Sequence, residues 1–150
     1  MAPAVSLLER LRARDWRITP QRRAVAEALT GEHVHLRADE IHARAQAVLP
    51  EVSRATVYNT LRELVEMGEL VELRVGSGPA RYDPNVGTAH HHLLCTECDT
   101  LIDVYPSGVE ALGLAPDQRH GYALDEVDII FRGRCPRCVG TGPTFSTAAT

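Results

Sequence analysis

The sequence predicts an α+β protein in two parts, a helical half that ends in a β-hairpin and a small C-terminal α/β unit. Three observations predict it. Apolar residues recur at helical spacing through the first half, alternating strand-like segments flank a Gly-Ser-Gly-Pro turn at 76–79, and two Cys-x2-Cys pairs lie in the second half. The 150 residues, 44% hydrophobic and 24% charged, argue against global disorder.

Four helices are predicted before residue 70, over residues 5–15, 20–30, 38–48 and 54–67. The second begins at Thr19-Pro20, a capping residue followed by a proline at the first helical position. The third has a poor capping residue, Arg37, and turns Val48 inward. Ser53 caps the fourth helix, and Gly68 ends it.

Residues 70–75 and 80–83 form the predicted hairpin. Helices followed by a hairpin describe a winged helix-turn-helix, whose last helix lies in the major groove of DNA. Arg54 and Tyr58 share one face of that helix, and residues 10–23 carry six arginines against one acidic residue. A solvated helix face is the alternative, but the three features together favour DNA. The predicted DNA-contacting residues are Arg17, Arg22, Arg54, Thr56, Tyr58 and Asn59.

The chain divides into four predicted regions. They are a winged-helix domain at 1–83, a hinge at 84–89, a dimerisation and metal-binding domain at 90–138, and a disordered tail at 139–150. Within the second domain the pattern predicts strands at 91–95 and 100–105, a helix at 107–119 and a strand at 122–132. No apolar run reaches membrane-spanning length, and the first segment turns charged too early for a secretory signal, so a cytoplasmic protein is expected.

The four cysteines form two knuckles, Cys95 with Cys98 and Cys135 with Cys138. Each knuckle offers two thiolates from one tight turn, and two knuckles complete a tetrahedral structural zinc site. Disulfides or free thiols are the alternative, and a cytoplasmic location makes disulfides improbable. Four cysteine ligands leave no open position for catalysis. We therefore expect one structural Zn(II) per chain.

Histidines and aspartates gather around the hinge. In an extended segment His90 and His92 point to one side and His91 to the other. Together with His35, Asp83 and Asp103, they form a candidate site of nitrogen and oxygen ligands that suits Fe(II), Mn(II) or Zn(II). Scattered surface residues are the alternative. His33, His42, His91 and His120 are expected to be ordinary surface histidines.

Six segments in order resemble the ferric uptake regulator family: ITPQR (18–22), ADEI (38–41), ATVYNTL (55–61), RYD (81–83), HHHLLCTEC (90–98) and the second knuckle. The resemblance implies a homodimeric, metal-dependent repressor that binds a palindromic operator. It also implies that His35, Asp83, His90, His92 and Asp103 hold the regulatory metal, Fe(II) or Mn(II), one per chain.

Two residues favour the peroxide-sensing branch of that family. Asp103 and Asn59 stand where iron regulators tend to have Glu and Arg. The resemblance then implies Fe(II)-catalysed oxidation of a histidine ligand, His35 or His90, in control of peroxide-defence genes such as catalase. An iron- or nickel-responsive repressor of metal uptake is the alternative. A third metal site of some relatives is not expected, because Val127 replaces its histidine.

Two other classes of function are alternatives to a regulator. A metalloenzyme could use an open metal position for hydrolysis, but the winged-helix half would then have no role. A zinc-ribbon interaction module would show no salt-dependent affinity for DNA. We therefore expect a regulator rather than an enzyme, with no membrane partner.

Overall fold

The computed structural model describes residues 5–140. They form two compact units, with the division after Thr88, inside the segment that the sequence assigns to the hinge. No helix among the described residues has the length and apolar character needed to cross a membrane.

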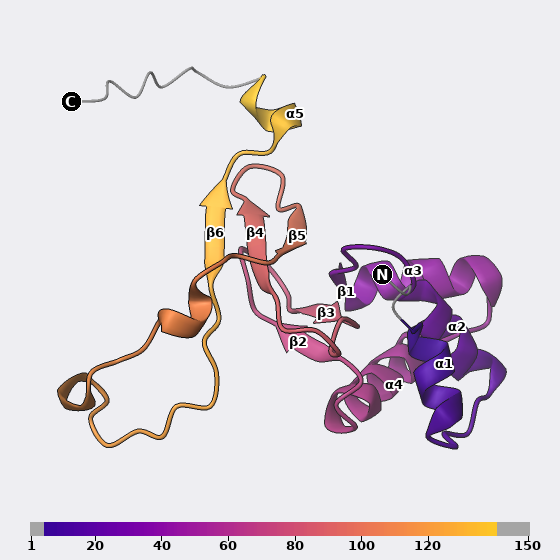
Figure 1. Cartoon of the computed structure of the whole chain (residues 1–150). Helices are drawn as coiled ribbons and strands as arrows, with labels where there is room; N and C mark the ends of the chain where they lie inside the picture. The colour runs from indigo at the N-terminus through magenta and orange to yellow at the C-terminus, as the bar shows by residue number, and fades with distance from the viewer. Residues whose placement is uncertain (1–4, 141–150) are drawn as a thin grey trace. The chain divides into compact units, whose positions relative to one another are not determined.

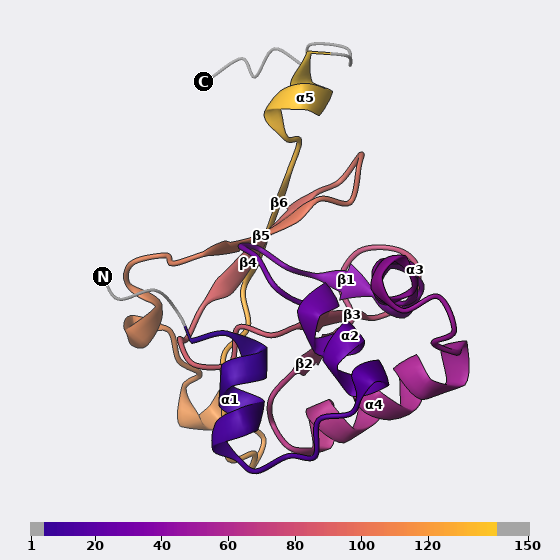
Figure 2. The same ribbon diagram turned by 90° about the vertical axis from the view of Figure 1, so that its right-hand side faces the viewer.

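The N-terminal unit contains four helices and a small sheet (Figures 1 and 2). The helices are α1 (Leu7–Ala13), α2 (Pro20–Ala28), α3 (Ala38–Val48) and α4 (Arg54–Glu66). Thr19 and Ser53 cap α2 and α4 as predicted, because each side chain accepts a hydrogen bond from a backbone N–H in the first turn. Helix α3 begins without a side-chain cap from Arg37, whose backbone N–H instead donates to Glu40 at 2.8 Å.

The helices pack around one apolar core, and the sheet lies beside them. The fully buried side chains of this core come from all four helices of the unit: Leu11, Val25, Ile41, Val57, Leu61 and Leu64. The prediction for Val48 was wrong, because this side chain is 66% exposed. Half-buried Leu49, the next residue, packs against the core in its place.

The sheet of this unit has the order β1-β3-β2, with all neighbours antiparallel. The predicted hairpin supplies β2 (Val71–Leu73) and β3 (Arg81–Asp83), and the unpredicted β1 (Leu36–Arg37) pairs with the other edge of β3. The sequence pattern did not reveal β1, because two residues are too few to show alternation. It nevertheless matters, since the pairing of Leu36 with Tyr82 brings His35 beside Asp83.

The C-terminal unit contains a sheet of order β5-β4-β6 (Figure 1). Strands β4 (His91–Cys95) and β5 (Leu101–Val104) form an antiparallel hairpin, and β6 (Ile130–Gly133) runs parallel to β4. A short helix, α5 (Pro136–Val139), follows β6 and extends one residue into the predicted tail, of which residues 141–150 lie outside the described part.

The prediction of a helix at 107–119 was wrong. This region holds only two 3-10 turns, Val109–Ala111 and Pro116–Gln118, and the strand predicted at 122–132 is reduced to β6. Residues 110–128 are exposed throughout, so their apolar side chains find no core within the unit to support regular structure.

Candidate metal centres and nucleic-acid interface

Strand direction brings the four cysteines together. Strands β4 and β6 are parallel, so both end at the same edge of the sheet, and one knuckle follows each strand. Cys95 pairs with Gly133 in this register, and the four sulfur atoms lie within 4.8 Å of one another. That arrangement fits the tetrahedral set of thiolates that a structural zinc ion requires.

The thiols of this cluster differ in acidity. The Cys135 N–H donates to Cys95 Sγ at 3.3 Å, and this hydrogen bond chiefly lowers the pKa of Cys95 to about 6. Interaction with the side chain of Cys135 raises the pKa of Cys138 to about 12. Accumulating four negative charges in this cluster therefore calls for a cation, which Zn(II) would supply.

Two of the five predicted regulatory ligands, His35 and Asp83, meet within the N-terminal unit. His35 Nε2 lies 3.4 Å from Asp83 Oδ2, with side chains only 1% and 2% exposed. Backbone groups contact the second ring nitrogen of His35 and the second carboxylate oxygen of Asp83. His35 Nδ1 lies 3.1 Å from the carbonyl oxygen of His33, and the N–H of Asn85 donates to Asp83 Oδ1 at 2.8 Å.

The C-terminal unit brings together the other three predicted ligands. His92 pairs with Asp103 across the hairpin, and His90 lies on the same face, its ring 4.9 Å from that of His92. The Nε2 atoms of His90 and His92 lie 3.5 and 3.8 Å from Asp103 Oδ1. The three side chains are between 4% and 9% exposed, and Asp128 Oδ1 lies 4.0 Å from His92 Nδ1.

Two of the remaining histidines have structural contacts. His91 points to the other side of β4, where its Nδ1 accepts a hydrogen bond from the N–H of Ile129 at 3.1 Å. His42 Nε2 donates to the carbonyl of Val52, also at 3.1 Å. Both are half-buried, so the expectation of ordinary surface histidines was wrong for these two. It holds for exposed His33 and His120.

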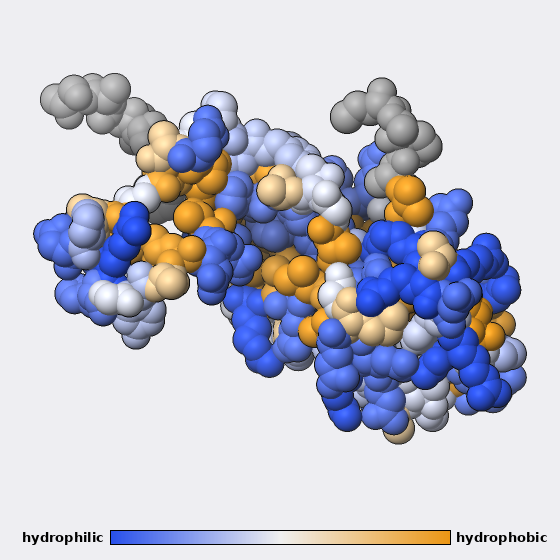
Figure 3. All heavy atoms as spheres, turned by 60° about the horizontal axis from the view of Figure 1, so that its bottom comes forward, coloured by the Kyte–Doolittle hydropathy of each residue, from blue (hydrophilic) through white to orange (hydrophobic). Residues whose placement is uncertain are grey.

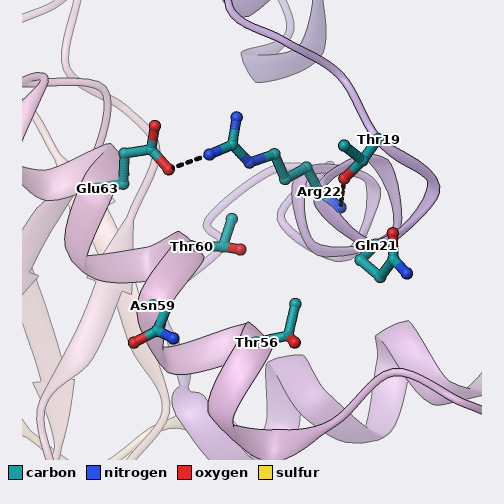
Figure 4. A pocket seen from close by; sticks show the side chains of 7 residues that line it. All are labelled: Thr19, Gln21, Arg22, Thr56, Asn59, Thr60 and Glu63. Carbon is teal, nitrogen blue, oxygen red and sulfur yellow. Dashed lines mark hydrogen bonds and ion pairs between the residues drawn. The ribbon is translucent and has the colours of Figure 1, made fainter.

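The face of α4 that the sequence assigns to DNA is exposed. Tyr58 is 44% exposed, and Arg54, the first residue of α4, forms an ion pair with Asp39 of α3. Thr56 and Asn59 line a polar pocket between α4 and the start of α2 (Figure 4). Its remaining lining residues are Thr19, Gln21, Arg22, Thr60 and Glu63.

The guanidinium of Arg22 is engaged inside the unit. It pairs with Glu63 at 2.7 Å, donates to the carbonyl of Arg17 at 2.9 Å and lies 4.4 Å from the centre of the Trp16 ring. Trp16 Nε1 donates to the same carboxylate at 2.9 Å. Sequence reasoning missed this network, because Glu63 is 41 positions from Arg22.

Comparisons with known proteins agree with this architecture. The chain is 37% identical to the transcriptional regulator FurA of Mycobacterium tuberculosis over 130 residues, 87% of this chain and 88% of that protein. It is 33% identical to the peroxide operon regulator of Bacillus subtilis over 131 residues, 87% and 90% of the two chains. Among solved structures, a zinc-bound manganese uptake regulator matches with a TM-score of 0.69 at 26% identity, covering 87% and 99%.

A match to a protein-family model also covers most of the chain. The model of the ferric uptake regulator family matches residues 13–132, which include α2, α3 and α4, the hairpin, both histidine-aspartate sets and the first cysteine knuckle. These matches and the fold they share identify a metal-responsive transcriptional regulator rather than a member of an enzyme family. The chain belongs to the ferric uptake regulator family.

Proposed function

We propose that this protein is a homodimeric, metal-dependent repressor that senses hydrogen peroxide. The observation that carries the proposal is the chemistry of the buried donors: three histidines and two aspartates, with no thiolate among them. Such a set favours Fe(II) or Mn(II) over a soft metal. We infer that His35 and Asp83 on one side of the hinge and His90, His92 and Asp103 on the other bind a single ion.

Linkage through the hinge gives the metal its regulatory effect. Ligands from both sides of residues 84–89 can bind one ion together only when the two units adopt a particular arrangement. The ion therefore favours that arrangement, and if DNA selects the same one, each tightens the binding of the other. The cysteine cluster, which would hold Zn(II), keeps the ends of β4 and β6 together whatever the regulatory site contains.

The N-terminal unit would place α4 in the major groove. In a winged helix-turn-helix the first turns of this helix contact base edges, and Arg54, Thr56, Tyr58 and Asn59 lie in those turns. Replacing Tyr58 by Ala should weaken operator binding about tenfold, the loss expected for one good base contact. The unfolding temperature should stay unchanged, because Tyr58 lies outside the core. Unaltered DNA affinity in the folded variant would assign DNA binding to another face.

The C-terminal unit offers a surface for a second copy of the chain. Five large apolar side chains in the segment that connects β5 to β6 are 44–74% exposed: Leu112, Leu114, Tyr122, Leu124 and Val127. Figure 3 shows apolar residues gathered at the surface of this unit. A dimer would cover them, and its two-fold axis would match a palindromic operator. The predicted strand at 122–132 would then gain the partner that the single chain lacks.

Peroxide sensing is the finer part of the proposal. Fe(II) would supply the chemistry that oxidises a ligand, and His35 and His90 are the candidate targets. Loss of one nitrogen donor removes a bond between metal and protein, so the metal-stabilised arrangement and the DNA complex are both lost. Asp103 and Asn59 support this branch over the alternative, an iron- or nickel-responsive repressor of metal uptake.

The deciding experiment compares two metals on the same protein. Duplex DNA selected from a random pool with the Mn(II)-loaded protein serves as the operator. With Fe(II), low peroxide should abolish binding and add one oxygen mass to a peptide that contains His35 or His90, whereas with Mn(II) binding should persist. Asp103→Glu should keep metal-dependent binding and reduce the response to peroxide. Zinc loss and disulfide formation with both histidines unmodified would show a thiol switch instead.

A further inference from the structure

His35 presents one defined ring nitrogen toward Asp83. A carbonyl oxygen only accepts hydrogen bonds, so the 3.1 Å contact with the His33 carbonyl requires the hydrogen of the neutral ring to be on Nδ1. Nε2 then keeps its lone pair, and it lies 3.4 Å from Asp83 Oδ2, which is also an acceptor. Two acceptors that face each other across this distance make a geometry suited to a cation between them.

The carbonyl of His33 depends on an uncommon backbone conformation. His33 has a φ of +51°, in the left-handed region that residues with a Cβ atom rarely adopt. Rotation of His33 to an extended conformation would turn its peptide group and carry the carbonyl oxygen away from His35. The His33 side chain is exposed, so the backbone is the part of the residue that reaches the buried site.

We propose that His33 is a positioning residue for the regulatory metal: its left-handed backbone, and not its imidazole, fixes His35 in the tautomer that offers Nε2 as a ligand. The inference rests on the proposed function for the identity of the site. It adds a residue that is not itself a ligand. It also predicts which substitutions are tolerated, since glycine adopts a positive φ freely, alanine less readily, and a β-branched residue least of all.

The test uses the full-length, zinc-loaded protein with His33→Gly, His33→Ala and His33→Val. Nitrogen-15 NMR of the ring of His35, before any regulatory metal is added, reports the tautomer directly. The wild type and His33→Gly should carry hydrogen on Nδ1, and His33→Val should lose that preference. Mn(II) affinity, measured by the EPR signal of free Mn(II), should stay within about threefold for His33→Gly. It should fall about 10- to 100-fold for His33→Val, the usual cost of losing an outer-shell partner, with His33→Ala between them.

The glycine and alanine variants keep the test decisive even if His33→Val does not fold. Both lack the imidazole and differ by one methyl group, so a difference between them reports the backbone alone. Equal tautomer preference and equal affinity in the two would overturn the proposal. So would a loss in His33→Gly as large as that in His33→Val, because the imidazole would then be what matters.

A separate variant distinguishes failure of the proposed function. If His35→Ala leaves Mn(II) affinity unchanged, His35 is not a ligand and the proposed regulatory site is wrong. The NMR comparison of the His33 variants would still show whether the backbone sets the tautomer. Zinc content and thermal unfolding of every variant confirm that the fold is retained.

Discussion

Arginines in residues 10–23 have different roles despite their closeness in sequence. Arg10 and Arg14 form ion pairs with Glu69 at 2.7 and 2.9 Å, and Arg22 pairs with Glu63. The side chain of Arg17 forms no ion pair or hydrogen bond within the described part of the chain, which leaves it available to a phosphate. The charge surplus that suggests DNA binding is therefore partly neutralised by glutamates far away in the chain.

Replacing Arg17 and Arg22 separately should distinguish these roles. Arg17→Ala should lower the salt dependence of operator binding by about one ion and leave the unfolding temperature unchanged. Arg22→Ala should destabilise the protein by on the order of 1 kcal/mol, because its partly exposed pair with Glu63 and its contact with Trp16 are lost. Salt titrations of DNA binding and thermal unfolding measure the two effects. Equal effects of both variants on the salt slope would mean that Arg22 also contacts a phosphate.

Among the elements, α1 depends most on its contacts with the rest of the N-terminal unit. Its seven residues are too few for a helix that is stable by itself. A capping box between Ser6 and Glu9 closes its first turn, and Leu11 enters the core. Arg10 extends from α1 to the carbonyl oxygens of Glu69 and Pro84, so α1 is tied to the chain directly after Asp83.

The pH dependence of stability should report the anchoring of α1. Burial raises the pKa of Glu69, but hydrogen bonds and charge from Arg10 and Arg14 outweigh it, and the net pKa lies below 4.5. A lowered pKa in the folded state stabilises the protein above about pH 4.5, and this contribution is lost as the pH falls through the folded value. Glu69→Gln should remove that part of the pH dependence. Urea unfolding between pH 3 and pH 7 measures it, with exposed Glu66→Gln as the control that should leave the profile unchanged.

The strand pair β4 and β6 should depend on zinc. Parallel strands of five and four residues are short, and the cysteines join them where both end. Cys95→Ser and Cys138→Ser should each reduce zinc from about one per chain to a small fraction, lower the unfolding temperature and weaken dimerisation, because a structural site contributes directly to folding. Metal analysis of washed protein decides the first point. Wild-type protein without zinc and with four titratable thiols would refute the assignment.

At the scale of the whole molecule, the proposed function requires a second copy of the chain. Leu124→Asp would place a charge among the exposed apolar side chains of the C-terminal unit and should shift the protein from dimer to monomer. Operator affinity should fall with it, because one chain reads only half of a palindrome. Val48→Asp is the control, since Val48 is also an exposed apolar residue, 66% against 46% for Leu124, but lies in the other unit. Analytical ultracentrifugation measures both, and a Leu124→Asp dimer of wild-type affinity would place the interface elsewhere.

Much of the fold could be predicted from local patterns. Helices α2, α3 and α4 follow from apolar spacing together with capping residues, and the hairpin β2–β3 follows from its turn. Each cysteine knuckle and the alternation of His90 and His92 also follow, because they depend on spacing within a few residues, whereas the parallel pairing of β4 and β6 brings the two knuckles together. The helix expected at 107–119 did not form, since its apolar residues have no core within the unit to pack against.

The sequence by itself determined the types of candidate ligand, the order of the four N-terminal helices and the hairpin, and the family. Only the tertiary structure decided which residues meet within each unit. The pairing of β1 with β3 brings His35 to Asp83, and the packing of the helices brings Arg10 of α1 to Glu69 and Arg22 of α2 to Glu63 of α4. Side-chain periodicity encodes which face of an element is buried, but not which distant partner will lie against it. Those partners are set by the packing of the whole unit, where hydrogen bonds and charges are satisfied together.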